Sequence, residues 1–122
     1  MKLMVVDDNK QVREGISLGI DWNEYGISKV RAYEDGAKAR DDLVDYCPDI
    51  VIADIRMPNL DGLEATKIIR ELSATVPIIA QSAFAYEQDR KAAKEAGCND
   101  FIAKPIADDK LKAMIHKWLL PS

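Results

Sequence analysis

The chain has 122 residues and a formal net charge of −4, and 48% of its residues are hydrophobic. This length suits one globular domain with one sizeable core, so we expect residues 1–122 to form a single domain. The acidic balance argues against direct nucleic-acid binding, because nucleic-acid-binding domains usually carry a basic excess or stripe. No apolar run approaches the roughly 20 residues needed to span a bilayer, and no signal peptide precedes the first predicted strand. We therefore expect a cytoplasmic protein with no membrane association.

The two cysteines, Cys47 and Cys98, lie far apart in the chain and lack the CxxC spacing of metal and redox motifs. We expect both to be reduced, mostly buried thiols that pack as small apolar residues. A reduced pair agrees with the cytoplasmic expectation.

Short apolar runs and segments with helical periodicity alternate along the chain. The apolar runs, rich in β-branched residues, are predicted as strands over residues 3–6, 29–33, 50–54, 77–82 and 101–103. The intervening periodic segments are predicted as helices over about residues 10–18, 36–46, 62–72, 87–96 and 108–119. Residues 21–26 are rich in turn formers and are predicted as a connection.

Several residues carry expectations about helix ends and packing. Asn9 is suited to be the N-cap of the first helix, Asp61 opens the third, and Gly97 suits the residue after the fourth. The helix over residues 36–46 holds few large apolar residues beyond Leu43 and Val44, so we expect it to pack thinly.

Three further side chains have simple structural interpretations. His116 is expected on a solvated face of the last helix, not as a ligand or phosphoacceptor. Trp22 and Trp118 are interpreted as packing residues.

Five predicted strands alternate with five predicted helices, a pattern typical of α/β proteins with a parallel sheet covered by helices on both faces. The connections should be right-handed. Among doubly wound sheets, five units of this size favour the strand order 2-1-3-4-5, which is the flavodoxin-like (βα)5 arrangement.

Polar residues that could bind a ligand or take part in a reaction stand at the carboxyl ends of the predicted strands: Asp7, Asp8, Asp54, Ser82 and Lys104. In the order 2-1-3-4-5, the strands that carry them are neighbours. Ligands of open α/β sheets bind at this edge, at the point where the strand order reverses. We therefore expect residues from distant parts of the chain to converge on one pocket, although each has an ordinary alternative interpretation as a loop or helix-start residue.

Three carboxylates at such close range repel one another and raise each other's pKa unless a cation lies among them. Mg²⁺ suits this site, because it binds one or two carboxylates, keeps several waters and shares its remaining positions with a phosphoryl group. The backbone carbonyl of Arg56 could complete the ligand set. An ionised Asp54 could then attack phosphorus and form an acyl phosphate, with Lys104 and Ser82 contacting the phosphoryl oxygens.

At these residues the chain resembles the receiver (response-regulator) domain of two-component signalling, over essentially its whole length. The matching pieces occur in order: Val5-Val6-Asp7-Asp8-Asn9, Asp54-Ile55-Arg56-Met57-Pro58, Leu60-Asp61-Gly62, Ser82-Ala83, and Gly97 through Phe101 to Lys104-Pro105. Each piece is weak by itself, whereas the whole set at these distances is highly specific.

The resemblance implies a role for each matching residue. Asp54 would accept a phosphoryl group from a phosphohistidine of a histidine kinase or histidine phosphotransfer protein, and the domain would catalyse its own phosphotransfer and dephosphorylation without being a classical enzyme. Asp7, Asp8, Asp54 and the Arg56 carbonyl would hold Mg²⁺, for which Mn²⁺ could substitute. Ser82 and Phe101 match the switch positions of the family. Lys104 matches its phosphate-binding lysine, and the bond to Pro105 is expected to be cis.

Two parts of the chain resemble two different branches of the receiver family. Residues 13–15 with 21–22 look like receivers attached to helix-turn-helix transcription factors, whereas residues 82–85 and 96–98 look like receivers of hybrid sensor kinases. We expect a stand-alone receiver or one taken from a longer chain, and the sequence does not identify its downstream effector. Nor does the sequence decide whether phosphorylation produces a homodimer through the fourth and fifth helices.

Three rival interpretations remain. A haloacid-dehalogenase-like phosphatase requires a second acidic residue two positions after its nucleophile, and this chain has Arg56 at that position. A flavin-binding module shares the architecture, but Asp7 and Asp8 would repel the flavin phosphate. A phosphorylation-independent pseudo-receiver, acting as a protein-binding module, is the alternative function.

Overall fold

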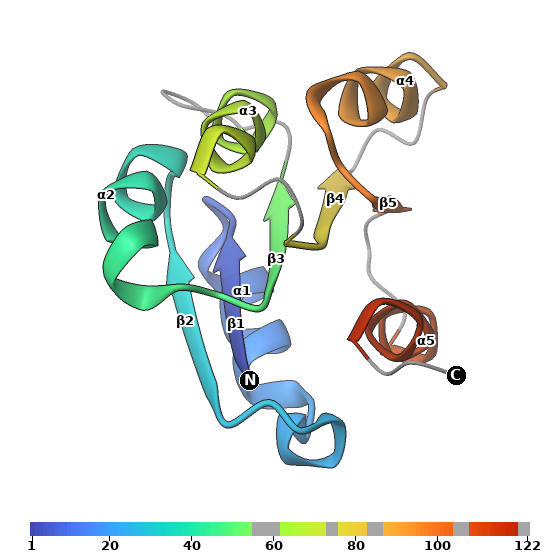
Figure 1. Cartoon of the computed structure of the whole chain (residues 1–122). Helices are drawn as coiled ribbons and strands as arrows, with labels where there is room; N and C mark the ends of the chain where they lie inside the picture. Colours follow the sequence, from blue (N-terminus) through green and yellow to red (C-terminus); the bar gives the residue numbers. More distant parts are fainter. Residues whose placement is uncertain (55–61, 73–75, 83–86, 104–107, 120–122) are drawn as a thin grey trace.

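The computed structural model describes residues 1–54, 62–72, 76–82, 87–103 and 108–119 (Figure 1). The strands are β1 (Lys2–Val6), β2 (Lys29–Tyr33), β3 (Ile50–Asp54), β4 (Ile78–Ser82) and β5 (Asp100–Ala103). The helices are α1 (Lys10–Gly19), α2 (Gly36–Tyr46), α3 (Gly62–Leu72), α4 (Glu87–Ala96) and α5 (Asp108–Leu119), and a short 3-10 helix, η1, covers Trp22–Tyr25. The predicted elements are confirmed to within about two residues at each end. The 3-10 turn lies in the segment expected to be a plain connection.

The strands form one parallel sheet in the order β2-β1-β3-β4-β5, as predicted. The register aligns the strand ends, since Val6 pairs with Ala53, Asp54 with Gln81 and Ser82 with Ala103. The carboxyl ends of β1, β3, β4 and β5 therefore reach the same edge of the sheet.

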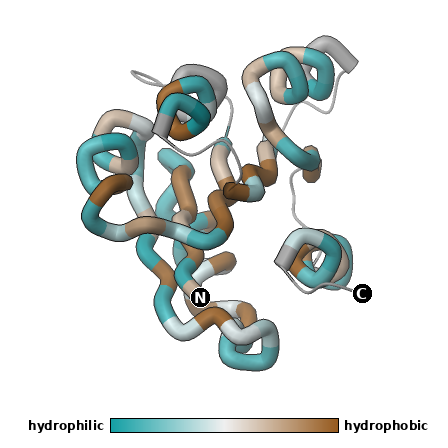
Figure 2. The backbone as a smooth tube through the Cα atoms, viewed as in Figure 1, coloured by the Kyte–Doolittle hydropathy of each residue, from teal (hydrophilic) through white to brown (hydrophobic). Residues whose placement is uncertain are grey.

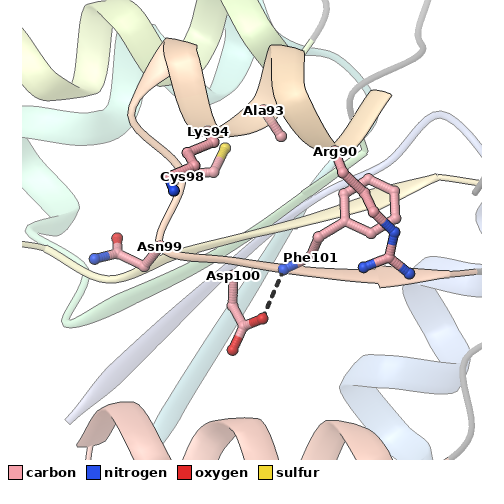
Figure 3. A pocket seen from close by; sticks show the side chains of 7 residues that line it. All are labelled: Arg90, Ala93, Lys94, Cys98, Asn99, Asp100 and Phe101. Atoms are coloured by element: carbon pink, nitrogen blue, oxygen red, sulfur yellow. Dashed lines mark hydrogen bonds between the residues drawn. The ribbon is translucent and has the colours of Figure 1, made fainter. Parts of the chain in front are cut away.

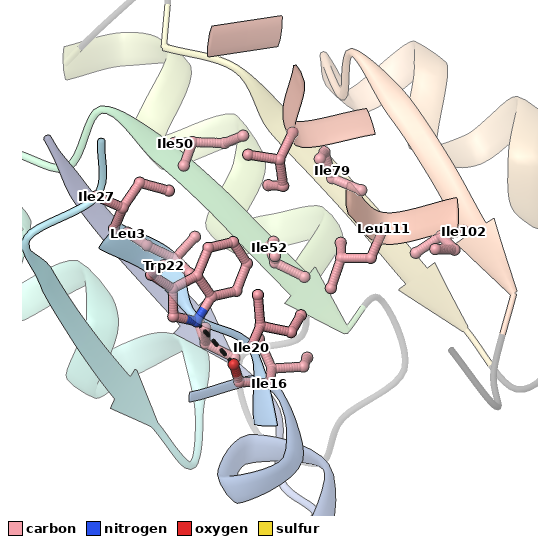
Figure 4. Packing of buried hydrophobic residues seen from close by; sticks show 12 residues of the cluster. Leu3, Ile16, Ile20, Trp22, Ile27, Ile50, Ile52, Ile79, Ile102 and Leu111 are labelled. Carbon is pink, nitrogen blue, oxygen red and sulfur yellow. Dashed lines mark hydrogen bonds between the residues drawn. The ribbon is translucent and has the colours of Figure 1, made fainter. Parts of the chain in front are cut away.

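One face of the sheet packs against α1 and α5 (Figure 4). Its core consists mostly of β-branched and leucine side chains from alternate strand positions, from these two helices and from the segment between α1 and β2: Leu3, Val5, Ile16, Ile20, Ile27, Ile50, Ile52, Ile79, Ile102, Leu111 and Ile115. Trp22 of η1 joins this core, and its indole N–H donates to the Ile16 carbonyl at 2.8 Å. Trp118 packs against the same cluster, so both tryptophans are packing residues as predicted, and His116 is exposed on α5 as expected.

The other face packs against α2, α3 and α4. Its core uses the alternate strand positions with residues from α2 and α3: Met4, Val6, Ala39, Leu43, Tyr46, Val51, Ala53, Ile69, Val76 and Ile78. The chain coloured by hydropathy is most apolar along the central strands (Figure 2). Both faces of β1, β3 and β4 are thus buried, as expected for a parallel sheet with continuous apolar runs. No helix in the described ranges is long and apolar enough to cross a membrane.

Helix α2 buries few side chains, and only one of the two large apolar residues noted from its sequence is among them. Val44 is 67% exposed, whereas Ala39, Leu43 and Tyr46 are buried. The Tyr46 hydroxyl donates to the Leu3 carbonyl at 2.9 Å, and the Arg31 guanidinium lies 4.8 Å from the centre of its ring. The aromatic ring of Tyr46 packs against the sheet and Val44 does not, because the helical period turns position 46 toward the sheet and position 44 away.

Strand β2 is an edge strand with one wetter face, as predicted, and its polar groups interact with α2. The Tyr33 hydroxyl and the Arg31 guanidinium both contact the Asp42 carboxylate. Partial burial, followed by the hydrogen bond to Asp42, raises the pKa of Tyr33 to about 12. These charged contacts cover the outer edge of the sheet and discourage further strand pairing.

Two predicted helix ends are confirmed. The Asn9 side chain accepts hydrogen bonds from the Gln11 and Val12 amides at the start of α1. Gly97 follows α4 with φ +110°, a left-handed conformation that favours glycine. A Cβ at this position would also lie 2.9 Å from Cγ of Arg70, whose guanidinium donates to the carbonyl of Gly97. The third expected cap, Asp61, lies outside the described residues.

The cysteines are both free, as expected, but they differ in burial. Cys98 is half-buried, and desolvation raises the pKa of its thiol, so that it is protonated at neutral pH. Cys47 is exposed, which corrects the expectation of burial. It ends α2 in a left-handed conformation with φ 50°, a position that turns the residue away from the core.

The core of the α1–α5 face makes a prediction about stability. Leu111 is fully buried and Leu18 is 81% exposed, so the same substitution should act very differently at the two positions. Leu111→Ala should lower the free energy of unfolding by about 2–5 kcal/mol, because it removes buried methyl groups and leaves a cavity. The matched control Leu18→Ala should stay within about 0.5 kcal/mol of the wild type. Urea unfolding followed by circular dichroism measures both, and equal losses would contradict the packing described here.

Candidate metal centre

Three carboxylates meet at the carboxyl edge of the sheet, where sequence reasoning placed them. Asp7 and Asp8 follow β1 directly, and Asp54 is the last residue of β3. One oxygen of each carboxylate lies within 4.8 Å of the others. Asp7 and Asp54 are buried, with exposed fractions of 0% and 4%, while Asp8 is exposed. The group is therefore open to solvent on one side and enclosed by protein on the other.

The strand ends fix the positions of the two buried acids. Val6 pairs with Ala53 across β1 and β3, and these fully buried strands leave little freedom to the residues that follow them. Side chains alternate along a strand, so Asp7 continues the row of Leu3 and Val5, and Asp54 continues the row of Ile50 and Ile52. Both acidic side chains thus lie on the α1–α5 face of the sheet, at its carboxyl edge.

Asp7 is held by several hydrogen bonds. One carboxylate oxygen accepts from the Asn9 amide at 2.8 Å, and the other accepts from the side-chain amide of Gln81 at 2.7 Å. Its backbone N–H donates to the Tyr33 carbonyl at 3.0 Å, and its carbonyl accepts from the Arg13 guanidinium at 2.8 Å. These hydrogen bonds fix the orientation of the Asp7 carboxylate and of the backbone beside it.

The donor set fits a hard divalent cation. Carboxylate oxygens are the ligands that Mg²⁺ prefers, at about 2.1 Å from the ion, so that opposite ligands lie about 4.2 Å apart. The spread of 4.8 Å among the three oxygens is within about 1 Å of that arrangement. The exposed Asp8 leaves the site accessible to water and to a phosphoryl group. Arg56, whose carbonyl was expected to complete the set, lies outside the described residues.

Ser82 lies at the end of β4, next to β3 in the sheet, and is fully buried. Its register partner, Ala103, is the last described residue before Lys104. The serine is thus at the sheet edge where the prediction placed it. Lys104 and its bond to Pro105 lie outside the described residues, so the predicted lysine contact and cis peptide stay predictions.

Phe101 lies in β5 with its ring against α4. It is 8% exposed and clusters with Ala80 and Ala93. The Arg90 guanidinium lies 4.8 Å from the centre of the ring (Figure 3). Beside it, a pocket of about 270 Å³ opens between α4 and β5. The aromatic side chain predicted as a switch is therefore in a buried position, with an arginine covering the ring.

One residue near the acids was not singled out from the sequence. Gln81 is fully buried in β4, and its amide contacts Asp7. The signal was present in the pattern of the strand. A glutamine is the only polar residue before the strand-end serine in the run Ile-Ile-Ala-Gln-Ser, and a buried polar side chain in a core strand requires a hydrogen-bond partner.

The comparisons with known proteins agree with this geometry. The chain belongs to the response regulator receiver domains, since the model of that family, "Response regulator receiver domain", matches residues 3–116. It is 33% identical over 119 residues to the response regulator MprA of Mycobacterium sp. (strain KMS), a match that covers 98% of this chain and 50% of the relative. The chain therefore spans about half the length of the curated relatives it matches.

Solved structures give the same result. The REC domain of AraT, a response regulator from Geobacillus stearothermophilus, superposes with a TM-score of 0.84 at 31% identity, covering 95% of this chain and 90% of that one. The receiver domain of the sensor histidine kinase PA1611 from Pseudomonas aeruginosa PAO1 superposes with a TM-score of 0.81 at 31% identity, covering 97% and 96%. That structure has a magnesium ion coordinated in its active-site cleft.

The contact between Arg90 and Phe101 can be tested by a double-mutant cycle. A cation over an aromatic ring at an exposed site contributes about 0.5–1 kcal/mol. The substitutions Arg90→Ala and Phe101→Leu should therefore show a coupling energy of this size in urea unfolding, because either change removes the same interaction.

Lys91→Ala provides the control, since Lys91 is an exposed cation on the same helix without a described contact to the ring. Its coupling to Phe101→Leu should be close to zero. Equal coupling for Arg90 and Lys91 would show that the ring is not specifically covered by Arg90.

Proposed function

We propose that residues 1–122 form one phosphoacceptor receiver domain of a two-component or phosphorelay system, with Asp54 as the acceptor. The observation that carries this proposal is the position of Asp54. It ends a fully buried strand, has only 4% of its surface exposed, and shares a site with two further carboxylates from the neighbouring strand. Family membership supports the same role.

The proposed chemistry is a phosphoryl transfer between two side chains. A carboxylate oxygen of Asp54 attacks the phosphorus of a phosphohistidine on a histidine kinase or histidine phosphotransfer protein. The P–N bond breaks, its electron pair stays on the imidazole nitrogen, and the acyl phosphate forms on Asp54. Hydrolysis of this acyl phosphate by water returns the carboxylate and releases inorganic phosphate. The domain is in this sense its own catalyst, without being a classical enzyme.

Asp7, Asp8 and Asp54, with the carbonyl of Arg56, are the proposed ligands of Mg²⁺, for which Mn²⁺ could substitute. A bound divalent cation would supply charge neutralisation for the acids and for the transferred phosphoryl oxygens. Asp7 contributes an oriented carboxylate because the Asn9 amide and Gln81 fix both of its oxygens. Lys104 is proposed to contact a phosphoryl oxygen, which a compact ammonium can do as a point charge.

The proposed output passes through Ser82 and Phe101. A phosphoryl group on Asp54 would attract the Ser82 hydroxyl, which lies one strand away. The described structure has the Phe101 ring buried against α4. Phosphorylation need only shift the balance between this position and an exposed one. The affected surface would be that of α4, β5 and α5, where a homodimer or a downstream effector could bind. The domain itself is proposed to act in the cytoplasm and without nucleic-acid contact.

A phosphorylation assay tests the proposed acceptor. Incubation with acetyl phosphate or phosphoramidate and Mg²⁺ should add one phosphoryl mass to the intact protein, because Asp54 is the nucleophile and the cation neutralises its neighbours. Asp54→Asn should remove the added mass, and so should a chelator. Intact-mass spectrometry measures the product.

The matched control is Asp41→Asn, which replaces an exposed aspartate of α2 that is not part of the acid cluster. The Asp41→Asn protein should still be phosphorylated on Asp54. A mass increase that persists in Asp54→Asn would contradict the assignment of the acceptor. A folded wild type that binds Mg²⁺ yet accepts no phosphoryl group, even from a phosphorylated partner kinase, would favour the pseudo-receiver alternative.

A further inference from the structure

Gln81 is a buried amide inside a core strand, next to the acid cluster. It precedes Ser82 in β4, it pairs in register with Asp54 of β3, and it is fully buried. Its side-chain nitrogen donates to Oδ2 of Asp7 at 2.7 Å. Hydrogen bonds to a charged acceptor are stronger than those between neutral groups, so this contact has energetic weight.

The hydrogen bond crosses a strand. The sheet order places β3 between β4 and β1, and neighbouring strands are about 4.8 Å apart, so the backbones of β4 and β1 lie roughly 10 Å from each other. Gln81 and Asp7 meet across the end of β3, on the same face as Asp54 by strand alternation. The Gln81 amide therefore lies beside the acid cluster and contacts it through Asp7.

The oxygen of the same amide has no hydrogen-bond partner among the described residues. Oε1 of Gln81 is buried and makes no hydrogen bond to any group in the described part of the chain. A buried polar atom left without a partner costs about 1–3 kcal/mol, and such atoms are rare in native proteins. Leucine or methionine at this position would avoid that cost but would also remove the hydrogen bond from Gln81 to Oδ2 of Asp7.

The orphaned oxygen lies close to the cluster. The two ends of a planar amide are about 2.3 Å apart, and Nε2 is 2.7 Å from Oδ2 of Asp7. Oε1 is therefore no more than about 5 Å from the Asp7 carboxylate. Mg²⁺ in proteins keeps several of its waters, and each of them is a hydrogen-bond donor. A cation held by the three acids would bring donors to the region where an acceptor is unsatisfied.

We propose that Gln81 is a positioning residue of the magnesium site, which orients Asp7 through Nε2 and accepts a hydrogen bond from a cation-bound water through Oε1. This inference rests on the proposed Mg²⁺ site and adds to it a residue from β4. It also connects the site to the strand that ends in Ser82, since the two residues are adjacent in the chain.

The test compares Mg²⁺ binding by the wild type and by Gln81→Met, which keeps the length of the side chain and removes both polar atoms. Residues that orient metal ligands typically contribute 10–100-fold to affinity, so the dissociation constant for Mg²⁺ should rise at least about tenfold, measured by calorimetry. The shift of the urea midpoint between chelator and Mg²⁺ should shrink accordingly, because ligand binding to the folded state stabilises it. Gln11→Met, on the exposed face of α1, should match the wild type in both measurements.

A second readout separates positioning from a merely structural role. The Mg²⁺ concentration that gives half-maximal phosphorylation by phosphoramidate should rise about tenfold in Gln81→Met, while the rate at saturating Mg²⁺ stays within about twofold of the wild type. Gln81→Leu serves as a second variant should Gln81→Met not fold. Unchanged or tighter Mg²⁺ binding in a folded variant would overturn the role of Gln81 alone. Absence of Mg²⁺ binding by the wild type would instead overturn the proposed metal site.

Discussion

Asp7, Asp8 and Asp54 place three carboxylates at one edge of the sheet, and the packing of β1 and β3 has to offset the repulsion between them. Like charges within 4.8 Å oppose one another, and two of the three side chains are buried. The fold nevertheless holds them together, because β1 and β3 are covered on both faces and hydrogen-bonded to each other along their whole length. The packing of the core thus holds three carboxylates at short range. A divalent cation bound among their oxygens would offset the repulsion between them.

The alternation of side chains along β4 places Gln81 and Ser82 on opposite faces of the sheet. Gln81 lies on the face of α1 and α5 and contacts Asp7, whereas alternation turns Ser82 toward the face where Phe101 packs with Ala80 and Ala93. The end of β4 therefore contacts the acid cluster through Gln81 and directs Ser82 toward the face on which Phe101 packs. In the proposed mechanism, a change at Asp54 would reach the α4–β5 surface through Ser82.

The sequence was sufficient to predict most of the architecture and the meeting of the three acids. Continuous apolar runs such as Ile50–Ile52, with helical periods between them, determine a parallel sheet, and the order of that sheet places the strand ends together. Side-chain detail was less accessible. Thin packing of α2 could be predicted from its composition, but the burial of Tyr46 and the exposure of Val44 could not, because a short amphipathic helix can turn by one position without changing its composition. The contact of Gln81 with Asp7 spans 74 positions and depends on the register of β4, which periodicity does not specify.

The stability of Asp8→Asn in the presence of a chelator measures the repulsion within the acid cluster most directly. Asp8 is exposed, so its replacement removes a charge from the cluster without disturbing the core. Relief of repulsion should move the urea midpoint above that of the wild type, and Mg²⁺ should then stabilise the variant less than it stabilises the wild type. Asp41→Asn, outside the cluster, should retain the wild-type response to Mg²⁺. A lower midpoint for Asp8→Asn in chelator, together with an unchanged response to Mg²⁺, would show that the three carboxylates do not form a strained cation site.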